Sequence, residues 1–219
     1  MKARVFYASF TVIMLAVSVC GCMTGSTFYT ARTLRPGKFS PGFGAEDLLL
    51  KSTEPSALSI TKVAIVPSFL FRLGLPLRFE TDAKFIPPEF IQVSLRDQIN
   101  PRSFRLFDFA PEVTFGDLFH AFSYLSYGAT LSKDIGGFEP YVHYSIYDFL
   151  HYNGVDFSNN GLFSILVGSL VNNDRFIGLG VGIPLSGFEL YPEVDYQYFR
   201  NDLRYGVYSF GIGIRGIPR

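Results

Sequence analysis

The sequence contains only two cysteines, Cys20 and Cys22, and none after residue 22. A chain with this cysteine usage has no disulfide framework, so its stability must come from side-chain packing or from a lipid bilayer. Long apolar runs are also missing after residue 22, which excludes a membrane-spanning helix in that part of the chain. There is no basic tract, which argues against nucleic acid as a partner.

Charged residues are scarce as well. They make up 17% of the chain, whereas a soluble domain averages about 25%. Aromatic residues reach 17%, and the mean hydropathy of +0.23 is high for a soluble protein. A hydrophobic exported chain without a spanning helix has one common way to contact lipid, a closed β-barrel.

The N-terminus has the three parts of a secretory signal. Met1–Arg4 is basic, Val5–Val19 is almost continuously apolar, and small residues follow. The stretch ending in Cys22 also resembles a lipobox, and we expect Cys22 to be lipidated because a glycine precedes it, whereas a valine precedes Cys20. The alternative is ordinary signal cleavage nearby with both cysteines incidental. We therefore expect a signal peptide over residues 1–21, an N-terminal tether over residues 22–37 and a β-barrel domain over residues 38–219.

Two consecutive runs near the C-terminus alternate apolar and polar side chains. In the first run the apolar set is Phe188, Leu190, Val194, Tyr196 and Tyr198, and the polar set is Glu189, Glu193, Asp195 and Gln197. After a turn at Asn201-Asp202, the second run sets Tyr208, Phe210, Ile212 and Ile214 against Ser209, Gly211, Gly213 and Arg215. A period of two places such sets on opposite faces of a strand.

Similar alternation recurs along the chain and gives ten or eleven strand candidates. Lys38–Ala45 is expected to be the first strand, Glu46–Leu58 a loop, and Phe163–Val171 either a strand or a short helix. Turn signals separate the candidates at intervals of about ten to fifteen residues. The sequence therefore predicts one all-β domain.

Strand length separates a barrel from a sandwich. Several runs have eight to twelve residues, about what a tilted strand needs to cross a bilayer, whereas sandwich strands average about five or six. Glycines such as Gly178, Gly180 and Gly213 suit a narrow lumen. We predict an antiparallel up-and-down transmembrane β-barrel of about 10–12 strands; a soluble β-sandwich or a lipocalin-like lipoprotein binding an apolar ligand is the alternative.

Charged side chains on the polar faces are expected to point into the barrel and to form a lumen charge network. Its expected members are Arg72, Arg78, Glu80, Glu112, Glu189, Glu193, Asp195 and Arg215. A barrel of about ten strands has little open width, so we expect opposite charges to pair across a sealed interior. The alternative is a cation-selective pore lined by Glu189, Glu193 and Asp195.

Catalytic signals are weak. His143, Ser145 and Glu139 share one face of a predicted strand, but residues two apart on a strand lie about 6.5–7 Å from each other, which is too far for a nucleophile and its base. The histidines lack metal-ligand spacing. We therefore expect a structural, narrow-pore or small-ligand role with no catalysis, no metal and no cofactor. The alternative is a lipid-modifying or lipid-cleaving barrel enzyme using His143 or His120.

Both ends of the chain resemble those of a group of uncharacterised bacterial outer-membrane barrel lipoproteins. The resemblance lies in the segment Phe28-Tyr29-Thr30-Ala31-Arg32-Thr33-Leu34 with the residues up to Phe39, and in the closing run Tyr191–Tyr196 with Gly206–Arg215. The resemblance implies an outer-membrane location and a barrel fold, and it brings no catalytic residues. Outer-membrane lipid and the barrel insertion machinery would then be the partners, and the oligomeric state is not specified.

Overall fold

The computed structural model describes residues 26–52, 60–87, 90–100, 106–118, 122–152, 174–198 and 205–217. Ten strands and one short 3₁₀ turn, η1, make up its regular structure. They are β1 (Phe39–Ser52), β2 (Ile60–Gly74), η1 (Pro76–Arg78), β3 (Phe79–Ile86), β4 (Phe90–Asp97), β5 (Asp108–Leu118), β6 (Phe122–Ser132), β7 (Glu139–Tyr152), β8 (Asp174–Leu185), β9 (Phe188–Tyr198) and β10 (Tyr205–Gly216).

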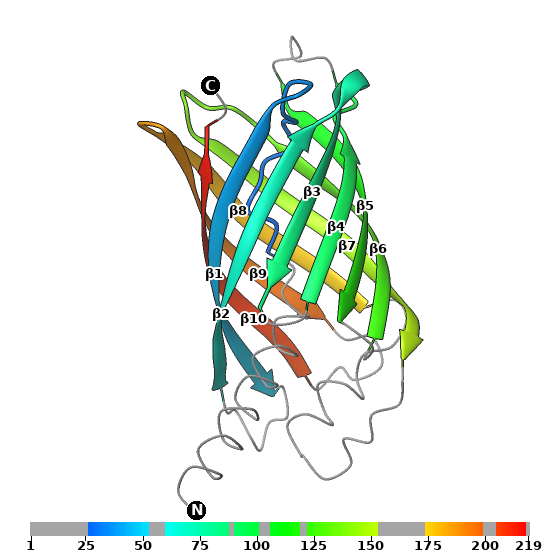
Figure 1. Ribbon diagram of the computed structural model, residues 1–219. Coiled ribbons are helices and arrows are strands. Elements are labelled where there is room, and N and C mark those ends of the chain that lie inside the picture. The colour runs from blue at the N-terminus through cyan, green and yellow to red at the C-terminus, as the bar shows by residue number, and fades with distance from the viewer. Residues whose placement is uncertain are drawn as a thin grey trace, which may run out of the picture.

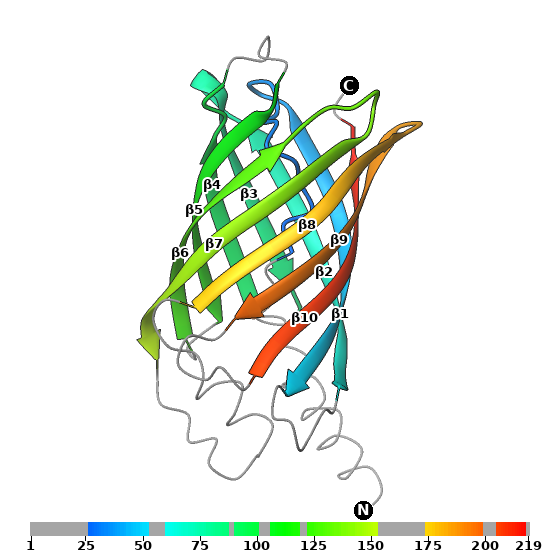
Figure 2. The same cartoon turned by 180° about the vertical axis from the view of Figure 1, so that it is seen from behind.

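The strands form one closed barrel in which each strand pairs with its neighbours in sequence and β10 pairs with β1 (Figure 1). Every pairing is antiparallel. The view from behind shows the same tilted strands continuing around the far side (Figure 2). The predicted all-β, antiparallel barrel of about 10–12 strands is therefore confirmed, with ten strands among the described residues.

The barrel is apolar outside and polar inside. In β4, Phe90, Gln92, Ser94 and Arg96 are buried, while the residues between them are exposed. Outward-facing side chains include Phe43, Phe69, Val93, Phe115, Leu179, Phe210 and Ile212, each at least 43% exposed. The strand period of two thus separates the two faces. No helix of the described residues is long and apolar enough to span a membrane.

Both ends of the barrel chain lie at one rim. The Gly37 N–H donates to the Gly74 carbonyl beside the start of β1, and the Ile217 N–H donates to the Gly187 carbonyl beside the end of β10. The connections at this rim include the two-residue turn between β8 and β9. The opposite rim holds the ends of β7 and β9, and residues 153–173 make the longest connection there.

The first strand is longer than the sequence indicated. β1 continues to Ser52, so Glu46, which the sequence placed in a loop, lies in a strand and points inward. A buried carboxylate is tolerated there because the Lys84 ammonium lies 2.5 Å from it. The segment Phe163–Val171 lies outside the described residues.

Candidate functional site

The N-terminal segment lies inside the barrel. Residues 26–34, called the plug from here on, run through the lumen without forming a helix or a strand (Figures 1 and 2). Phe28 and Ala31 are fully buried, and Tyr29 is 1% exposed. This part of the expected tether therefore fills the interior of the barrel.

Contacts with the wall give the direction of the plug. Ser26 donates to Asp195 in the middle of β9, and its carbonyl accepts from Lys84 of β3. The Leu34 N–H donates to Glu80, which lies at the start of β3. Because β3 begins at the rim where Gly37 meets β2, the plug runs from the middle of the lumen to that rim.

Tyr29 lies at the centre of a cluster of arginines. The guanidinium carbon of Arg96 is 3.7 Å from the centroid of the Tyr29 ring, and those of Arg215 and Arg72 are 5.5 and 5.9 Å away. The Tyr29 hydroxyl donates to Glu112 on β5. Cations over an aromatic face are attracted by its quadrupole, so three wall cations and one wall carboxylate hold a single plug side chain.

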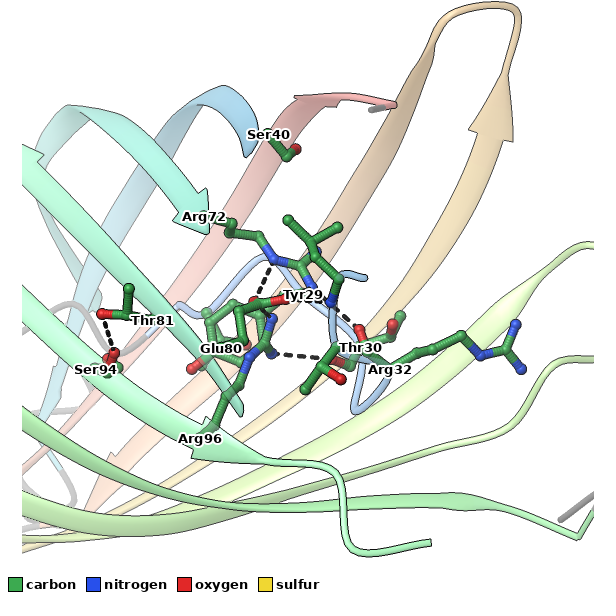
Figure 3. Close-up of polar contacts among 12 residues, drawn as sticks. Tyr29, Thr30, Arg32, Ser40, Arg72, Glu80, Thr81, Ser94 and Arg96 are labelled. Carbon is green, nitrogen blue, oxygen red and sulfur yellow. Dashed lines mark hydrogen bonds and ion pairs between the residues drawn. The ribbon is translucent and has the colours of Figure 1, made fainter. Parts of the chain in front are cut away.

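Glu80 holds two of these arginines in place (Figure 3). Arg72 Nε lies 2.6 Å from Glu80 Oε1 and Arg72 Nη2 lies 2.8 Å from Glu80 Oε2, a two-point contact. Arg96 forms an ion pair with the same carboxylate, which is fully buried. Figure 3 shows Arg72 and Arg96 approaching Glu80 beside Tyr29. This geometry fixes the plane of each guanidinium next to the plug.

Phe28 occupies a socket lined by glycine. A Cβ atom on Gly44, Gly211 or Gly213 would lie 2.6 Å from the Phe28 side chain. Phe28 itself has a positive φ of 50°, a conformation that is uncommon for residues other than glycine. Of the glycines that suggested a narrow lumen in the sequence, Gly213 therefore makes room for an aromatic side chain of the plug, whereas Gly178 and Gly180 lie against wall side chains.

Two carboxylates of β9, Glu193 and Asp195, bind the plug. Glu193 accepts the N–H groups of Thr27 at 2.9 Å and Phe28 at 2.7 Å, together with the Tyr141 hydroxyl at 2.6 Å. Asp195 accepts the hydroxyls of Ser26 and Ser209.

The expected lumen charge network is brought together in part. Six of its members are buried: Arg72, Glu80, Glu112, Glu193, Asp195 and Arg215. Glu189 lies partly buried and accepts the Tyr191 hydroxyl. Arg78 is exposed in the η1 turn and donates to the Ile99 carbonyl at 3.4 Å. It points away from the lumen because it belongs to the turn and not to the inward face of β3.

Arg215 has different partners from those expected. It is 1% exposed, and its Nη2 donates to the Thr27 carbonyl at 3.1 Å. Its guanidinium carbon also lies 6.0 Å from the centroid of the Tyr191 ring. Among the described residues no ion pair within 4.0 Å joins Arg215 to a carboxylate, so the plug and aromatic rings replace the expected acidic partner.

Sequence reasoning missed several interior charges. Lys84 pairs with Glu46 at 2.5 Å, and Arg32 pairs with Asp108 at 3.1 Å. Arg96 was not assigned to the network, although it shares the polar side of an alternating run with Gln92 and Ser94. The alternation already placed Lys84 and Arg96 on the inward face, so that signal was sufficient to find them.

A small pocket opens beside the plug at the same rim. Its volume is about 210 Å³, and its lining includes Thr30, Arg32, Asp134, Glu139 and Glu189. In the turn between β6 and β7, the Gly137 N–H and then the Arg32 guanidinium lower the pKa of Asp134 below its usual value. Arg32 Nη1 lies 3.2 Å from that carboxylate.

The residues considered for catalysis do not form a triad. His143 Nδ1 lies 2.9 Å from Thr130 Oγ1, and Glu139 accepts from Ser132. Within the described ranges no hydrogen bond joins His143 to Ser145 or Glu139, and no group of three His, Cys, Asp or Glu side chains is arranged to hold a metal ion. His120 lies outside the described residues.

Comparisons with known proteins give distant likenesses only. No family model matches the sequence, and no curated protein does. Among solved structures, the translocator domain of the autotransporter NalP from Neisseria meningitidis has a TM-score of 0.48 and 9% identity over 99% of this chain and 97% of that one. The outer membrane protease OmpT from Escherichia coli has a TM-score of 0.42 and 8% identity over 85% and 99%.

The attachment invasion locus protein Ail of Yersinia pestis has a TM-score of 0.33 and 10% identity, with coverage of 82% of this chain and 99% of that one. At these identities and TM-scores the likenesses carry no argument about what this chain does.

Proposed function

We propose that this protein is a bacterial outer-membrane β-barrel lipoprotein whose own N-terminal segment closes the lumen, so that its role is structural and not that of an open porin or an enzyme. The observation that carries the proposal is the distribution of side chains: apolar groups cover the outside, charges line the inside, and the plug fills the space between those charges. An apolar exterior with a polar interior is the pattern of barrels in lipid.

The same distribution weighs against a soluble lipocalin-like cup, which would bury apolar side chains inside. The wall around the plug presents instead Glu46, Arg72, Glu80, Arg96 and Glu193, all 3% exposed or less. Around the plug the described interior therefore presents charged groups to a ligand, and its apolar cluster of Leu70, Tyr141 and Tyr191 is occupied by Phe28 of the plug. The outward rows of phenylalanine, leucine and isoleucine would be left in water.

The barrel's orientation follows the usual asymmetry of connections, with short turns facing the periplasm and longer loops facing outward. The rim that carries Gly37 and Ile217 also carries the two-residue turn between β8 and β9. In the proposed arrangement this rim faces the periplasm, and the rim at which β7 ends and β8 begins faces the exterior.

Planar-bilayer recording of the purified full-length protein tests the proposal. A sealed barrel inserts without producing steady current, and insertion is verified in parallel by protease protection in liposomes and by the change in gel migration on boiling. Ohmic current from the wild-type protein would contradict the sealed lumen. Failure to enter liposomes would contradict the membrane location.

Lipidation of Cys22 belongs to the same proposal, because a glycine precedes this cysteine and an apolar segment leads up to it. Metabolic acyl labelling of the wild type and of Cys22→Ala tests it, with Cys20→Ala as the matched control. We expect Cys22→Ala alone to lose the label. Label that survives this substitution would show that Cys22 is not the modified residue.

A further inference from the structure

The main chain of the plug is hydrogen-bonded by side chains of the barrel wall. None of the backbone–backbone hydrogen bonds that the described residues form in turns and ladders involves residues 26–32 or Leu34. A buried peptide group without a partner is costly. The lumen must therefore satisfy these groups by other means.

Acidic, amide and hydroxyl side chains of the wall accept the plug's N–H groups. The pairs are Thr27 with Glu193 at 2.9 Å, Phe28 with Glu193 at 2.7 Å, Ala31 with Ser132 at 3.1 Å, Thr33 with Gln98 at 3.3 Å and Leu34 with Glu80 at 2.6 Å. Contacts of this kind use the peptide N–H, which every residue except proline carries.

Basic side chains of the wall donate to the plug's carbonyls in the complementary way. The pairs are Ser26 with Lys84 at 3.1 Å, Thr27 with Arg215 at 3.1 Å, Thr30 with Arg96 at 3.0 Å and Arg32 with Arg72 at 3.1 Å. These four are all the buried lysine and arginine side chains of the described wall, and each one binds a different plug carbonyl. Figure 3 shows the contact of Arg96 with Thr30.

Two side chains of the plug add anchors to this main-chain recognition. Phe28 fills the glycine socket, and Tyr29 lies against Arg96 and donates to Glu112. We propose that the lumen wall is a peptide-binding site, which takes an extended peptide whose main chain is bound by wall side chains and which carries two adjacent aromatic residues, and that residues 26–34 are its resident occupant. This inference rests on the plug geometry of the proposed function but not on membrane location or conductance.

The site should accept the same segment as a separate peptide once the resident plug is removed. The receptor is the full-length chain with residues 26–34 replaced by glycine and serine, in detergent. The probe is a fluorescent synthetic peptide with the sequence of residues 26–35, followed by anisotropy. We expect saturable binding to this variant and at least about tenfold weaker binding to the wild type, in which the site is filled.

A change of one backbone atom tests main-chain recognition directly. An ester in place of the amide between Thr27 and Phe28 removes the N–H that Glu193 accepts and leaves every side chain unchanged. We expect this peptide to bind about tenfold more weakly, as for the loss of a hydrogen bond to a charged group. The matched control is an ester between Phe28 and Tyr29, because the Tyr29 N–H donates to no wall group in the described residues. The proposal is overturned if both esters bind like the parent peptide.

A second measurement applies if the replaced variant does not fold. In the otherwise wild-type chain, the temperature of the heat-dependent gel shift is compared for Glu193→Gln and Thr27→Ala. Both residues belong to the contact between Glu193 and the plug. Glu193→Gln weakens the acceptor of the Thr27 and Phe28 N–H groups, whereas Thr27→Ala removes only a hydroxyl that lies 3.4 Å from the Glu193 carboxylate. We expect Glu193→Gln to lower the temperature clearly and Thr27→Ala to leave it within a few degrees. Equal losses would show that the wall recognises side chains and not the main chain.

Discussion

Phe28 of the plug packs against Gly213 of β10 so closely that a Cβ atom on Gly213 would lie 2.6 Å from the phenylalanine side chain. Gly213→Val should therefore destabilise the folded barrel by about 1–3 kcal/mol, the usual cost of overpacking. Unfolding in detergent, followed by gel migration, measures the loss.

The Phe28→Gly change should relieve that loss in the double variant, because it removes both the Cβ atom and the ring that a valine would meet. Gly216→Ala on the same strand is the matched control, since its Cβ would lie 3.6 Å from its nearest neighbour, an ordinary contact. Strictly additive losses in the double variant would show that Gly213 does not act through Phe28.

Glu80 should be the most sensitive carboxylate of the lumen. It is fully buried and pairs with both Arg72 and Arg96. Glu80→Ala would leave two buried guanidiniums without their carboxylate, and removing one partner of a buried ion pair typically costs about 3–5 kcal/mol. Arg72→Ala should lower the free energy of unfolding by less, because Glu80 still forms its ion pair with Arg96. The free energies of unfolding of the two variants in detergent decide the order, and a larger loss for Arg72→Ala would contradict it.

Replacing the plug with glycine and serine should open a cation-selective pore. The described wall buries seven carboxylates, Glu46, Glu80, Asp82, Asp108, Glu112, Glu193 and Asp195, against the four cations Arg72, Lys84, Arg96 and Arg215. Rings of carboxylates favour cations. Reversal potentials in asymmetric KCl measure the selectivity of the plug-replaced variant. Anion-selective current would show that the arginines dominate the lumen.

The outward face should not tolerate charge. Phe210 and Val194 lie opposite each other near the middle of β10 and β9, and they are 51% and 44% exposed. Phe210→Arg should destabilise the barrel by about 2–4 kcal/mol in a bilayer, the cost reported for arginine at mid-depth. Leu77→Arg in the exposed η1 turn is the control and should cost little. Equal stability of the two variants in liposomes would mean that Phe210 does not face lipid.

The rim contact of Asp134 should depend on pH. Its pKa is lowered in the folded state by the Gly137 N–H and Arg32. The folded pKa lies below the unfolded value of 3.8. The contribution of the ionised Asp134 carboxylate to folding stability is therefore complete above pH 3.8 and is lost as the pH falls through the folded pKa. Asp134→Asn should therefore slightly lower the unfolding temperature at pH 7 and have no effect at a pH below the folded pKa. An equal loss at both pH values would exclude titration of Asp134 as the cause.

The barrel was predictable from sequence because one local rule governs the whole wall. Alternation placed Glu193, Asp195 and Arg215 inside and Val194 and Phe210 outside, as the structure has them. Where that rule was interrupted, the prediction failed: Arg78 belongs to a turn, and Glu46 was taken for part of a loop.

The plug was not predictable in this way. Its residues follow no period of two, and its contacts join positions far apart in the chain, such as Phe28 with Glu193. Periodicity reports on a residue's immediate neighbours along a strand and not on what fills the space that the strands enclose. The pairing expected for Arg215 failed for the same reason, since its hydrogen-bond partner is the Thr27 carbonyl.

The socket of Phe28 also bears on the order in which this molecule assembles. Gly44 and Gly213 are direct partners in the ladder between β1 and β10, and this seam joins the first strand of the sheet to the last. The aromatic ring therefore lies across the seam at which the cylinder closes. If the barrel closed while its lumen was empty, the Phe28 ring would have to enter afterwards past the long charged side chains of the wall. We therefore expect the ring and the seam to come together in a single late step, with the N-terminal segment as the internal template around which the strands close.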